Sequence, residues 1–315
     1  MQKIVFLERN TFTINFPRPR FEHEWIEFGE TRADQIVERL QGATIAICNK
    51  LPLRESELSR LPGLKLIAVA ATGVDNIDLD YCRDHEIAVC NARNYAGHSL
   101  PEHVFMLILA LRRNLTSYLQ DVRQGRWHTA KQFCLLDYPI RNLHGSTIGI
   151  LGFGFLGRAV AQMARAFGMQ VVVAEHKNAV GIREGRLPFE QVLEQSDIVT
   201  LHCPLNESTV NLLGKRELQQ MKRDALLINT ARGALVDAAS LAHVLREGLI
   251  GGAGVDVLSL EPPADGNPLL EPGIPNLLIT PHIGWASSEA MHALANQLVG
   301  SIESFMRGES RNRIV

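Results

Sequence analysis

The feature that most constrains the fold is a series of short, continuously apolar runs that alternate with helix-length amphipathic segments along the whole chain. A strand with one face in water alternates apolar and polar residues, so uninterrupted runs indicate strands buried on both faces, as in parallel sheets covered by helices. The runs span residues 3–7, 44–47, 64–69, 147–151, 170–173, 197–201, 225–228 and 277–279. The sequence therefore predicts an α/β protein with doubly wound parallel sheets.

The length of the chain favours two domains, because 315 residues exceed what one hydrophobic core usually serves. A long helical pattern runs over residues 99–124, and Ser99 with Glu102 has the spacing of a capping box. Residues 125–143 are irregular and predict an arm or a long loop, whereas residues 286–306 predict one terminal helix.

Charge, hydropathy and cysteine spacing argue against several classes of protein. A net charge of −2, without a block of like charges, argues against a nucleic-acid partner. The apolar stretch at residues 104–111 is too short to cross a bilayer, so we expect no membrane span. Five cysteines are scattered without paired spacing, which favours a reducing, cytoplasmic location and indicates neither a disulfide framework nor a metal site.

A glycine-rich loop with the pattern G-x-G-x-x-G occupies residues 152–157, between a predicted strand and a predicted helix. In such a turn Gly152 permits the tight bend, Gly154 lets the backbone approach a pyrophosphate, and Gly157 allows close packing of the helix on the strand. The amides at the helix start favour the negative charge of phosphates. The loop therefore predicts a dinucleotide site.

An acidic residue, Glu175, ends the strand that follows the glycine loop. Its offset of about twenty residues suits a carboxylate that bonds the adenosine ribose hydroxyls. Because a carboxylate there repels a 2′-phosphate, we expect NAD to be favoured over NADP. His176 and Lys177 follow at once and could soften that choice.

Three polar residues in the C-terminal half, Arg232, Glu261 and His282, each lie in a short motif downstream of the glycine loop. Taken singly, such residues are most often surface or structural. In this order they predict a hydride-transfer site, where the cation holds a carboxylate and a carbonyl, the imidazole moves a proton and the carboxylate sets the charge of the imidazole.

With these motifs the chain resembles the D-isomer-specific 2-hydroxyacid dehydrogenase family over nearly its whole length. Within the family it is most similar to glycerate dehydrogenases, which are hydroxypyruvate reductases, through residues 90–96 and 133–140. The anchors of the wider resemblance are the glycine loop and residues 71–78, 229–237, 254–257, 261–262 and 281–284.

The resemblance implies a Rossmann NAD-binding domain at residues 99–285, inserted into a flavodoxin-like substrate domain made of residues 1–98 and 286–315. It also implies a homodimer joined through the NAD-binding domain, with residues 125–143 as the arm that reaches the partner.

The resemblance assigns roles to matching positions. It implies that His282 donates the proton to the C2 oxygen, that an ionised Glu261 orients and charges the imidazole, and that Arg232 polarises the carbonyl and binds the substrate carboxylate. The backbone amides of Gly73 and Val74 resemble the loop that binds the carboxylate. The implied cofactor contacts are Gly152, Gly154, Phe155, Leu156, Gly157, Glu175, Cys203, Pro204, Thr209, Thr230, Ala231, Asp256, His282 and Gly284.

The expected reaction is reduction of hydroxypyruvate or glyoxylate to D-glycerate or glycolate, with NADH preferred and NADPH as a weaker alternative. A phosphoglycerate or D-lactate dehydrogenase is an alternative on the same fold. Formate dehydrogenase is less favoured, because we expect a glutamine in place of Glu261 there. A non-catalytic, NAD-sensing protein of the corepressor type is an alternative from a different class.

Overall fold

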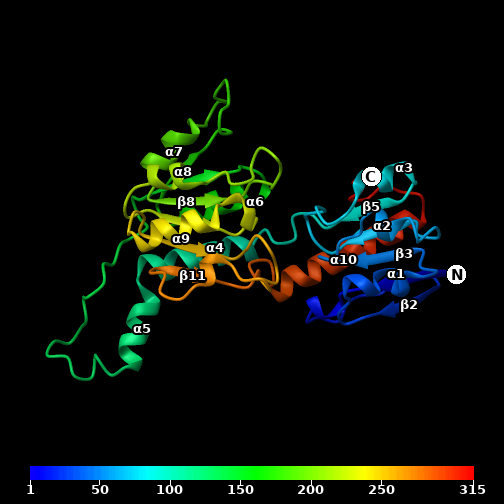
Figure 1. The fold of residues 1–315 in the computed structure, drawn as a ribbon, viewed down its shortest axis with the longest axis horizontal. Helices are drawn as coiled ribbons and strands as arrows, with labels where there is room; N and C mark the ends of the chain where they lie inside the picture. The colour runs from blue at the N-terminus through cyan, green and yellow to red at the C-terminus, as the bar shows by residue number, and fades with distance from the viewer. The chain divides into compact units, whose positions relative to one another are not determined.

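The structure, a computed structural model, describes residues 1–315 and divides the chain into two compact units. Unit 1 consists of Met1–Tyr95 and Ala286–Val315, and unit 2 consists of Ala96–Trp285, so the second unit is inserted into the chain of the first. Each unit contains its own parallel sheet with helices on both faces (Figure 1). The predicted α/β class with two doubly wound parallel sheets is confirmed.

Unit 1 contains a five-stranded sheet in the order β2-β1-β3-β4-β5, in which every pair is parallel. This order is the flavodoxin-like one, with its switch point between β1 and β3. The strands are β1 (Gln2–Phe6), β2 (His23–Glu27), β3 (Ile45–Cys48), β4 (Leu66–Val69) and β5 (Ala88–Asn91).

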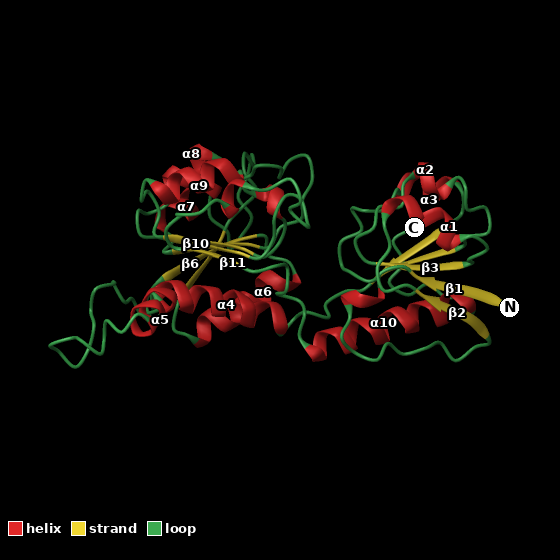
Figure 2. Ribbon diagram, turned by 60° about the horizontal axis from the view of Figure 1, so that its bottom comes forward, coloured by secondary structure: helices red, strands yellow, loops and turns green.

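Three short helices cover one face of this sheet and α10 (Ser288–Met306) covers the other (Figure 2). The short helices are α1 (Ile36–Leu40), α2 (Glu55–Leu58) and α3 (Leu79–Asp84). Two 3-10 turns precede them in the chain: η1 (Arg9–Thr11) follows β1, and η2 (Ala33–Gln35) leads into α1. Helix α10 begins where the side chain of Ser287 accepts a hydrogen bond from the amide of Ala290. Its buried side chains include Leu294 and Leu298, four residues apart, which is the spacing of one helix face.

Unit 2 contains a six-stranded parallel sheet in the order β11-β10-β9-β8-β6-β7. The strands are β6 (Thr147–Leu151), β7 (Gln170–Val173), β8 (Ile198–Leu201), β9 (Leu226–Asn229), β10 (Gly252–Val255) and β11 (Leu277–Ile279). The direction of winding reverses between β6 and β8. In open sheets of this kind, ligands bind beyond the carboxyl ends of the strands at that reversal.

Helices cover both faces of this second sheet (Figure 2). One face carries α4 (Ser99–Arg112) and α6 (Phe155–Ala166), and the other carries α7 (Phe189–Gln195), α8 (Lys215–Gln220) and α9 (Ala238–Arg246). Helix α5 (Leu115–Arg123) and the loop after it extend away from the sheet (Figure 1), and η3 (Gly233–Leu235) and η4 (Pro268–Leu270) are single 3-10 turns. No helix combines the length and the apolar character that a membrane span requires.

Two details of the helix prediction were wrong. The pattern at residues 99–124 forms two helices, because Asn114 adopts a left-handed conformation with φ of 48° that an α-helix cannot continue through. The capping box of Ser99 and Glu102 does not form, because His98 is the N-cap and the Ser99 hydroxyl donates to the carbonyl of Gly284 instead.

The apolar runs match eight of the eleven strands and miss β2, β5 and β10. The runs at 147–151, 170–173 and 277–279 coincide with β6, β7 and β11. Strand β10 lies outside the predicted runs because it begins with Gly252 and contains Gly254, and glycine is depleted in strands. These glycines sit where α4 packs closely on the sheet.

Candidate active site

Arg232, Glu261 and His282 follow three neighbouring strands of unit 2. Arg232 comes three residues after β9, Glu261 lies in the loop after β10, and His282 comes three residues after β11. Because β9, β10 and β11 are parallel neighbours, their carboxyl ends meet at one edge of the sheet. The topology therefore collects the cation, the carboxylate and the imidazole at the same edge.

The imidazole and the carboxylate are in direct contact. Nδ1 of His282 lies 2.5 Å from Oε2 of Glu261, and Oε1 of the same carboxylate accepts a hydrogen bond of 2.7 Å from the amide of Leu258. Both side chains are part-exposed, at 24% for His282 and 30% for Glu261. Since Nδ1 is engaged, Nε2 is the ring nitrogen that can exchange a proton with a bound substrate.

The loop that carries His282 is held by the buried carboxylate of Asp256. His282 has a φ of 56°, which is uncommon for a residue with a side chain, and its amide donates to the carbonyl of Asp256 at 2.8 Å. The carboxylate of Asp256 accepts from the amides of Ile283 at 3.0 Å and Gly284 at 2.8 Å. Three successive backbone amides, those of His282, Ile283 and Gly284, are therefore bonded to Asp256.

Two further side chains complete this support. The hydroxyl of Thr280 donates to Oδ1 of Asp256 at 2.5 Å, and Nε2 of His103 lies 3.0 Å from that hydroxyl and 3.3 Å from Oδ1. Burial raises the pKa of Asp256, but hydrogen bonds from His103, Thr280 and the two amides outweigh burial and hold it below its ordinary value. The carboxylate is therefore ionised. Sequence reasoning found Asp256 only as a cofactor contact and missed His103 and Thr280.

The turn that carries Arg232 is held by Asn229. The Nδ2 group of Asn229 donates to the carbonyl of Arg232 at 2.8 Å, and its Oδ1 accepts from the amide of Ala231 at 3.1 Å. A Cβ atom at Gly233 would overlap the backbone of Leu258, so only glycine allows this close approach. The Arg232 turn therefore packs directly against the start of the loop that carries Glu261.

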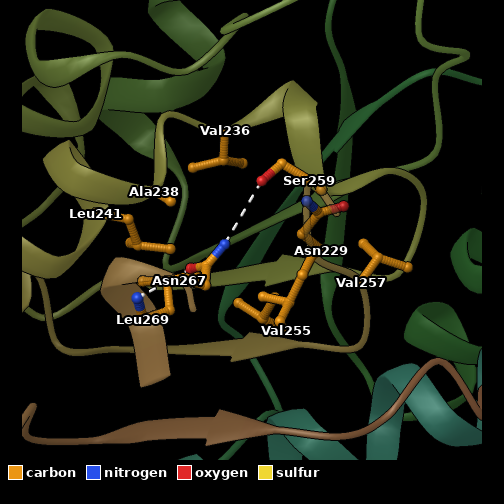
Figure 3. Close-up of a pocket in the computed structure, with 11 residues that line it drawn as sticks. Asn229, Val236, Ala238, Leu241, Val255, Val257, Ser259, Asn267 and Leu269 are labelled. Atoms are coloured by element: carbon orange, nitrogen blue, oxygen red, sulfur yellow. Dashed lines mark hydrogen bonds between the residues drawn. The ribbon is translucent and has the colours of Figure 1, made fainter. Parts of the chain in front are cut away.

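A small pocket lies behind this turn (Figure 3). Its lining combines Asn229 with mostly apolar side chains such as Val255 and Leu269. Asn267 crosses it, with its Nδ2 group 3.5 Å from the hydroxyl of Ser259. None of the three predicted catalytic residues lines this pocket, so we interpret it as packing space that supports the two loops.

The glycine loop has the geometry that a pyrophosphate requires. Gly152 has a φ of 98°, and a Cβ atom there would overlap the backbone of Cys203. Gly154 is the N-cap of α6, and a Cβ atom built on it meets nothing within 4 Å. Phe155 and Leu156 open the helix and Gly157 is buried against β6. The open space in front of the helix amides suits a negatively charged group.

Thr230 supplies a second sign that a polar ligand fits here. Its Oγ1 atom is buried and has no hydrogen-bond partner, and the residue immediately precedes Ala231 at the carboxyl edge of the sheet. Buried hydroxyls are normally bonded, so an unbonded one beside a candidate site is consistent with a bound polar group. The residues present therefore fit a dinucleotide.

The first two residues of the loop after β8, His202 and Cys203, are uncharged near neutral pH. Burial raises the pKa of Cys203 to about 11, so its thiol stays protonated near neutral pH. Burial lowers the pKa of His202 to about 4, so this imidazole is neutral as well. The hydroxyl of Thr209 donates to the carbonyl of Pro204 at 2.8 Å, and this bond holds the loop in its compact form.

Glu175 lies two residues after the end of β7, so the prediction that it ends the strand was wrong by two residues, and its carboxylate is buried under the segment that follows. Both oxygens accept hydrogen bonds from the guanidinium of Arg183, and the amides of His176 and Arg183 also donate to them, at 2.8 and 3.1 Å. The Arg183 side chain is the main reason that the pKa of Glu175 lies far below its ordinary value. Sequence reasoning missed Arg183, because no motif marks it.

Gly73 and Val74 lie in unit 1, in the segment that leads from β4 towards α3. Both residues are half-buried, and Val74 packs against the hydrophobic core of that unit. Their contact with a substrate stays a prediction.

Comparison with known proteins supports the chemistry of this site. Residues 105–284 match the model of the D-isomer-specific 2-hydroxyacid dehydrogenase NAD-binding domain. Glycerate dehydrogenase of Methylorubrum extorquens is 49% identical over 99% of this chain and 98% of its own. A Thermus thermophilus structure matches with a TM-score of 0.85 and 31% identity over 100% of both chains.

An NADPH-dependent glyoxylate/hydroxypyruvate reductase from Sinorhizobium meliloti also matches, with a TM-score of 0.83 and 26% identity over 100% of this chain and 98% of that one. The resemblance seen in the motifs is confirmed by the family match and by the near full-length identity with the Methylorubrum extorquens enzyme. The chain belongs to the D-isomer-specific 2-hydroxyacid dehydrogenase family, whose NAD-binding domain takes a nicotinamide cofactor.

Proposed function

We propose that the protein reduces hydroxypyruvate, and glyoxylate as a second substrate, to the corresponding D-2-hydroxy acid. The observation that carries the proposal is the 2.5 Å contact between Nδ1 of His282 and Oε2 of Glu261 at the edge that also carries Arg232. Reduction of a keto acid needs a proton at the new alcohol oxygen, and this pair is built to deliver one. The similarity to the Methylorubrum extorquens glycerate dehydrogenase supports the choice of substrate.

When bound, a nicotinamide cofactor supplies the hydride. The guanidinium of Arg232 offers a planar fork that binds the carboxylate of a 2-oxo acid and polarises its C2 carbonyl. The Nε2 proton of His282 passes to the carbonyl oxygen as that oxygen gains negative charge. Glu261 accepts from Nδ1, so it keeps the ring oriented and favours the imidazolium form before transfer.

Glu261 also separates this proposal from formate oxidation on the same fold. Formate gives up a hydride without exchanging a proton, so a carboxylate that charges the imidazole has no role there. A nucleotide-sensing protein of the corepressor type keeps the same fold and site, so the pair does not distinguish it from an enzyme. Turnover of any keto acid with a reduced nucleotide distinguishes an enzyme from such a sensor.

The proposal is tested with a panel of hydroxypyruvate, glyoxylate, pyruvate, phenylpyruvate and phosphohydroxypyruvate, each with NADH and with NADPH. We expect the largest kcat/KM with hydroxypyruvate, then glyoxylate. A preference for phosphohydroxypyruvate or pyruvate would reassign the substrate to the phosphoglycerate or D-lactate type. Absence of turnover with every acid, despite nucleotide binding, would favour the sensor.

We propose NADH as the preferred nucleotide, with NADPH as a weaker alternative. The acidic Glu175 just after β7 supports this choice, because that position lies beside the glycine loop. The hydrogen bond from Arg183 to Glu175 affects how strongly NADH is preferred over NADPH.

We propose a homodimer formed through unit 2. The support is a set of exposed apolar side chains on α5 and on the arm, defined as residues 125–143, and monomers rarely expose such a patch. The set is Leu115, Leu119, Val122, Trp127, Phe133, Leu136 and Ile140. A variant with Phe133→Asp and Leu136→Asp should be monomeric by light scattering, while Met306→Asp in unit 1 should not change the mass. A dimeric arm variant would contradict the proposal.

We also propose that the protein works in a reducing compartment, the cytoplasm. All five cysteines are unpaired, and Cys48, Cys82 and Cys90 are buried. Burial raises the pKa of Cys82 to about 11 and that of Cys90 to about 12, so these thiols stay protonated near neutral pH. Cell fractionation with a cytosolic marker tests the location.

A further inference from the structure

The carboxylate of Glu175 is hidden, whereas the guanidinium that binds it is open to solvent. The side chain of Glu175 is 3% exposed and that of Arg183 is 55% exposed. Arg183 donates to the carboxylate through Nε at 2.7 Å and through Nη2. A ribose that approaches this position from solvent meets the guanidinium before it meets the acid.

The carboxylate has little capacity left to accept bonds from a ribose. Besides the two bonds from the Arg183 side chain, it accepts bonds from the amides of His176 and Arg183. Turning the carboxylate towards a ligand would break several of these bonds in a buried place, which is costly. Glu175 therefore acts mainly as the anchor of the Arg183 side chain.

Two guanidiniums lie close to the carboxylate of Glu175. Nη1 of Arg186 lies 3.8 Å from Oε1 of Glu175, so one carboxylate faces the guanidiniums of Arg183 and Arg186. Lys177 is paired with Glu217 at 3.0 Å and adds no net charge. A 2′-phosphate on the ribose would therefore meet a carboxylate whose charge is offset by two guanidiniums, which weakens the expected repulsion by Glu175.

The position in the sheet suits a contact with the adenosine ribose. Strand β7 is the parallel neighbour of β6, and the glycine loop follows β6. In Rossmann folds the residue at the end of this second strand meets the ribose, and a nearby arginine accommodates the 2′-phosphate. Nη1 of Arg183 is not used by Glu175, so it can donate to a phosphate oxygen.

We propose that Arg183, held in place by Glu175, contacts the adenosine ribose and makes NADPH a working cofactor beside NADH. The proposal rests on the use of a nicotinamide nucleotide in the proposed function. Arg183 acts here as a specificity-determining residue, and Glu175 acts as its positioning residue. The preference for NADH is then narrow, whereas a solvent-facing carboxylate would make it wide.

The test measures nucleotide binding by the fluorescence of NADH and NADPH, with no keto acid present. For the natural protein we expect dissociation constants for the two nucleotides that differ by less than about ten-fold. Arg183→Gln should raise the dissociation constant of NADPH by about ten-fold or more, because a charge-assisted bond to the phosphate is lost. The dissociation constant of NADH should rise by no more than about three-fold. Arg307→Gln is the matched control, since Arg307 bonds Glu309 with the same two groups, Nε and Nη2, in unit 1. It should change neither constant.

A second variant tests the same role without removing Arg183. Glu175→Gln keeps the shape of the side chain but removes the charge that holds the guanidinium of Arg183, so it should raise the dissociation constant of NADPH by about three-fold or more relative to that of NADH. Equal weakening of both nucleotides by Arg183→Gln, or an unshifted ratio in Glu175→Gln, overturns the role of Arg183. So does a natural preference for NADH above about ten-fold. Because no substrate is present, failure of every keto acid in turnover assays overturns the proposed substrate and leaves this result standing.

Discussion

Nδ1 of His282 lies 2.5 Å from Oε2 of Glu261, although the two residues follow different strands of the sheet in unit 2. Because Nδ1 contacts the acid, Nε2 is the ring nitrogen that faces away from it. The contact also couples the charge of the imidazole to that of the carboxylate. Neither residue is deeply buried, so water or a substrate can reach the ring.

Replacing His282 with Gln should lower kcat for keto-acid reduction by about 10²–10⁴-fold, because the proton donor is lost. NADH binding should change by less than about three-fold, since the glycine loop is untouched. His243→Gln on the exposed side of α9 is the control and should behave as the natural protein. Stopped-flow reduction together with nucleotide titration checks both quantities, and equal losses in the two would make His282 a cofactor ligand only.

Replacing Glu261 with Gln removes the negative charge that favours the imidazolium form of His282. The pH above which reduction declines should therefore move to lower values, because a neutral ring cannot donate the proton. The natural protein and the variant are compared by kcat/KM between pH 5 and 9. An unshifted profile with reduced activity would mean that Glu261 only holds the loop through Leu258.

Replacing Arg232 with Lys keeps the positive charge but removes the planar fork. We expect a higher KM for the keto acid and a lower kcat, together about 10²-fold or more in kcat/KM. Arg246→Lys is a control, because Arg246 pairs with Glu271 on the surface of the same unit. Near-normal kinetics of the Arg232 variant would remove it from the site.

Much of the fold could be predicted because the buried parallel strands are almost purely apolar. The run at 147–151 is correct to the residue because β6 is buried along almost its whole length. The run at 170–173 is also correct, although β7 is an edge strand and is only partly buried. The search for apolar runs did not find strand β2, because His23–Glu27 is largely polar and half-exposed at the edge of its sheet. The break at Asn114 depends on one left-handed residue inside a helical pattern, which periodicity does not reveal.

Some residues of the site could also be predicted from the sequence, whereas the contacts that support them could not. Arg232, Glu261 and His282 stand in local motifs, so their order alone pointed to the chemistry. The contact of His103 with Asp256 joins residues far apart in the chain, and no local pattern encodes it. The pairing of Glu175 with Arg183 depends on how one loop folds back over a strand. Contacts of this kind become visible only in three dimensions.

Asp256 provides the last prediction, because its carboxylate accepts bonds from Thr280, Ile283 and Gly284. In Asp256→Asn the new NH₂ group would meet donors, so we expect a loss of about 2 kcal/mol in the free energy of unfolding. The His282 turn would loosen, so kcat should fall as well. Asp265→Asn, on the exposed part of the same long loop, is the control and should leave both quantities unchanged.

The loss should depend on pH in a defined direction. The pKa of Asp256 is lowered below its ordinary 3.8, against the effect of burial, by bonds from His103, Thr280 and two amides, so its ionised form stabilises the fold. That contribution is complete above the ordinary pKa and is lost as the pH falls through the lowered one. The difference in unfolding free energy between the natural protein and Asp256→Asn should therefore be constant from about pH 5 to 7 and shrink below about pH 4. Denaturant titrations across this range measure it, and a difference that grows on acidification would show that the carboxylate does not hold the loop as an anion.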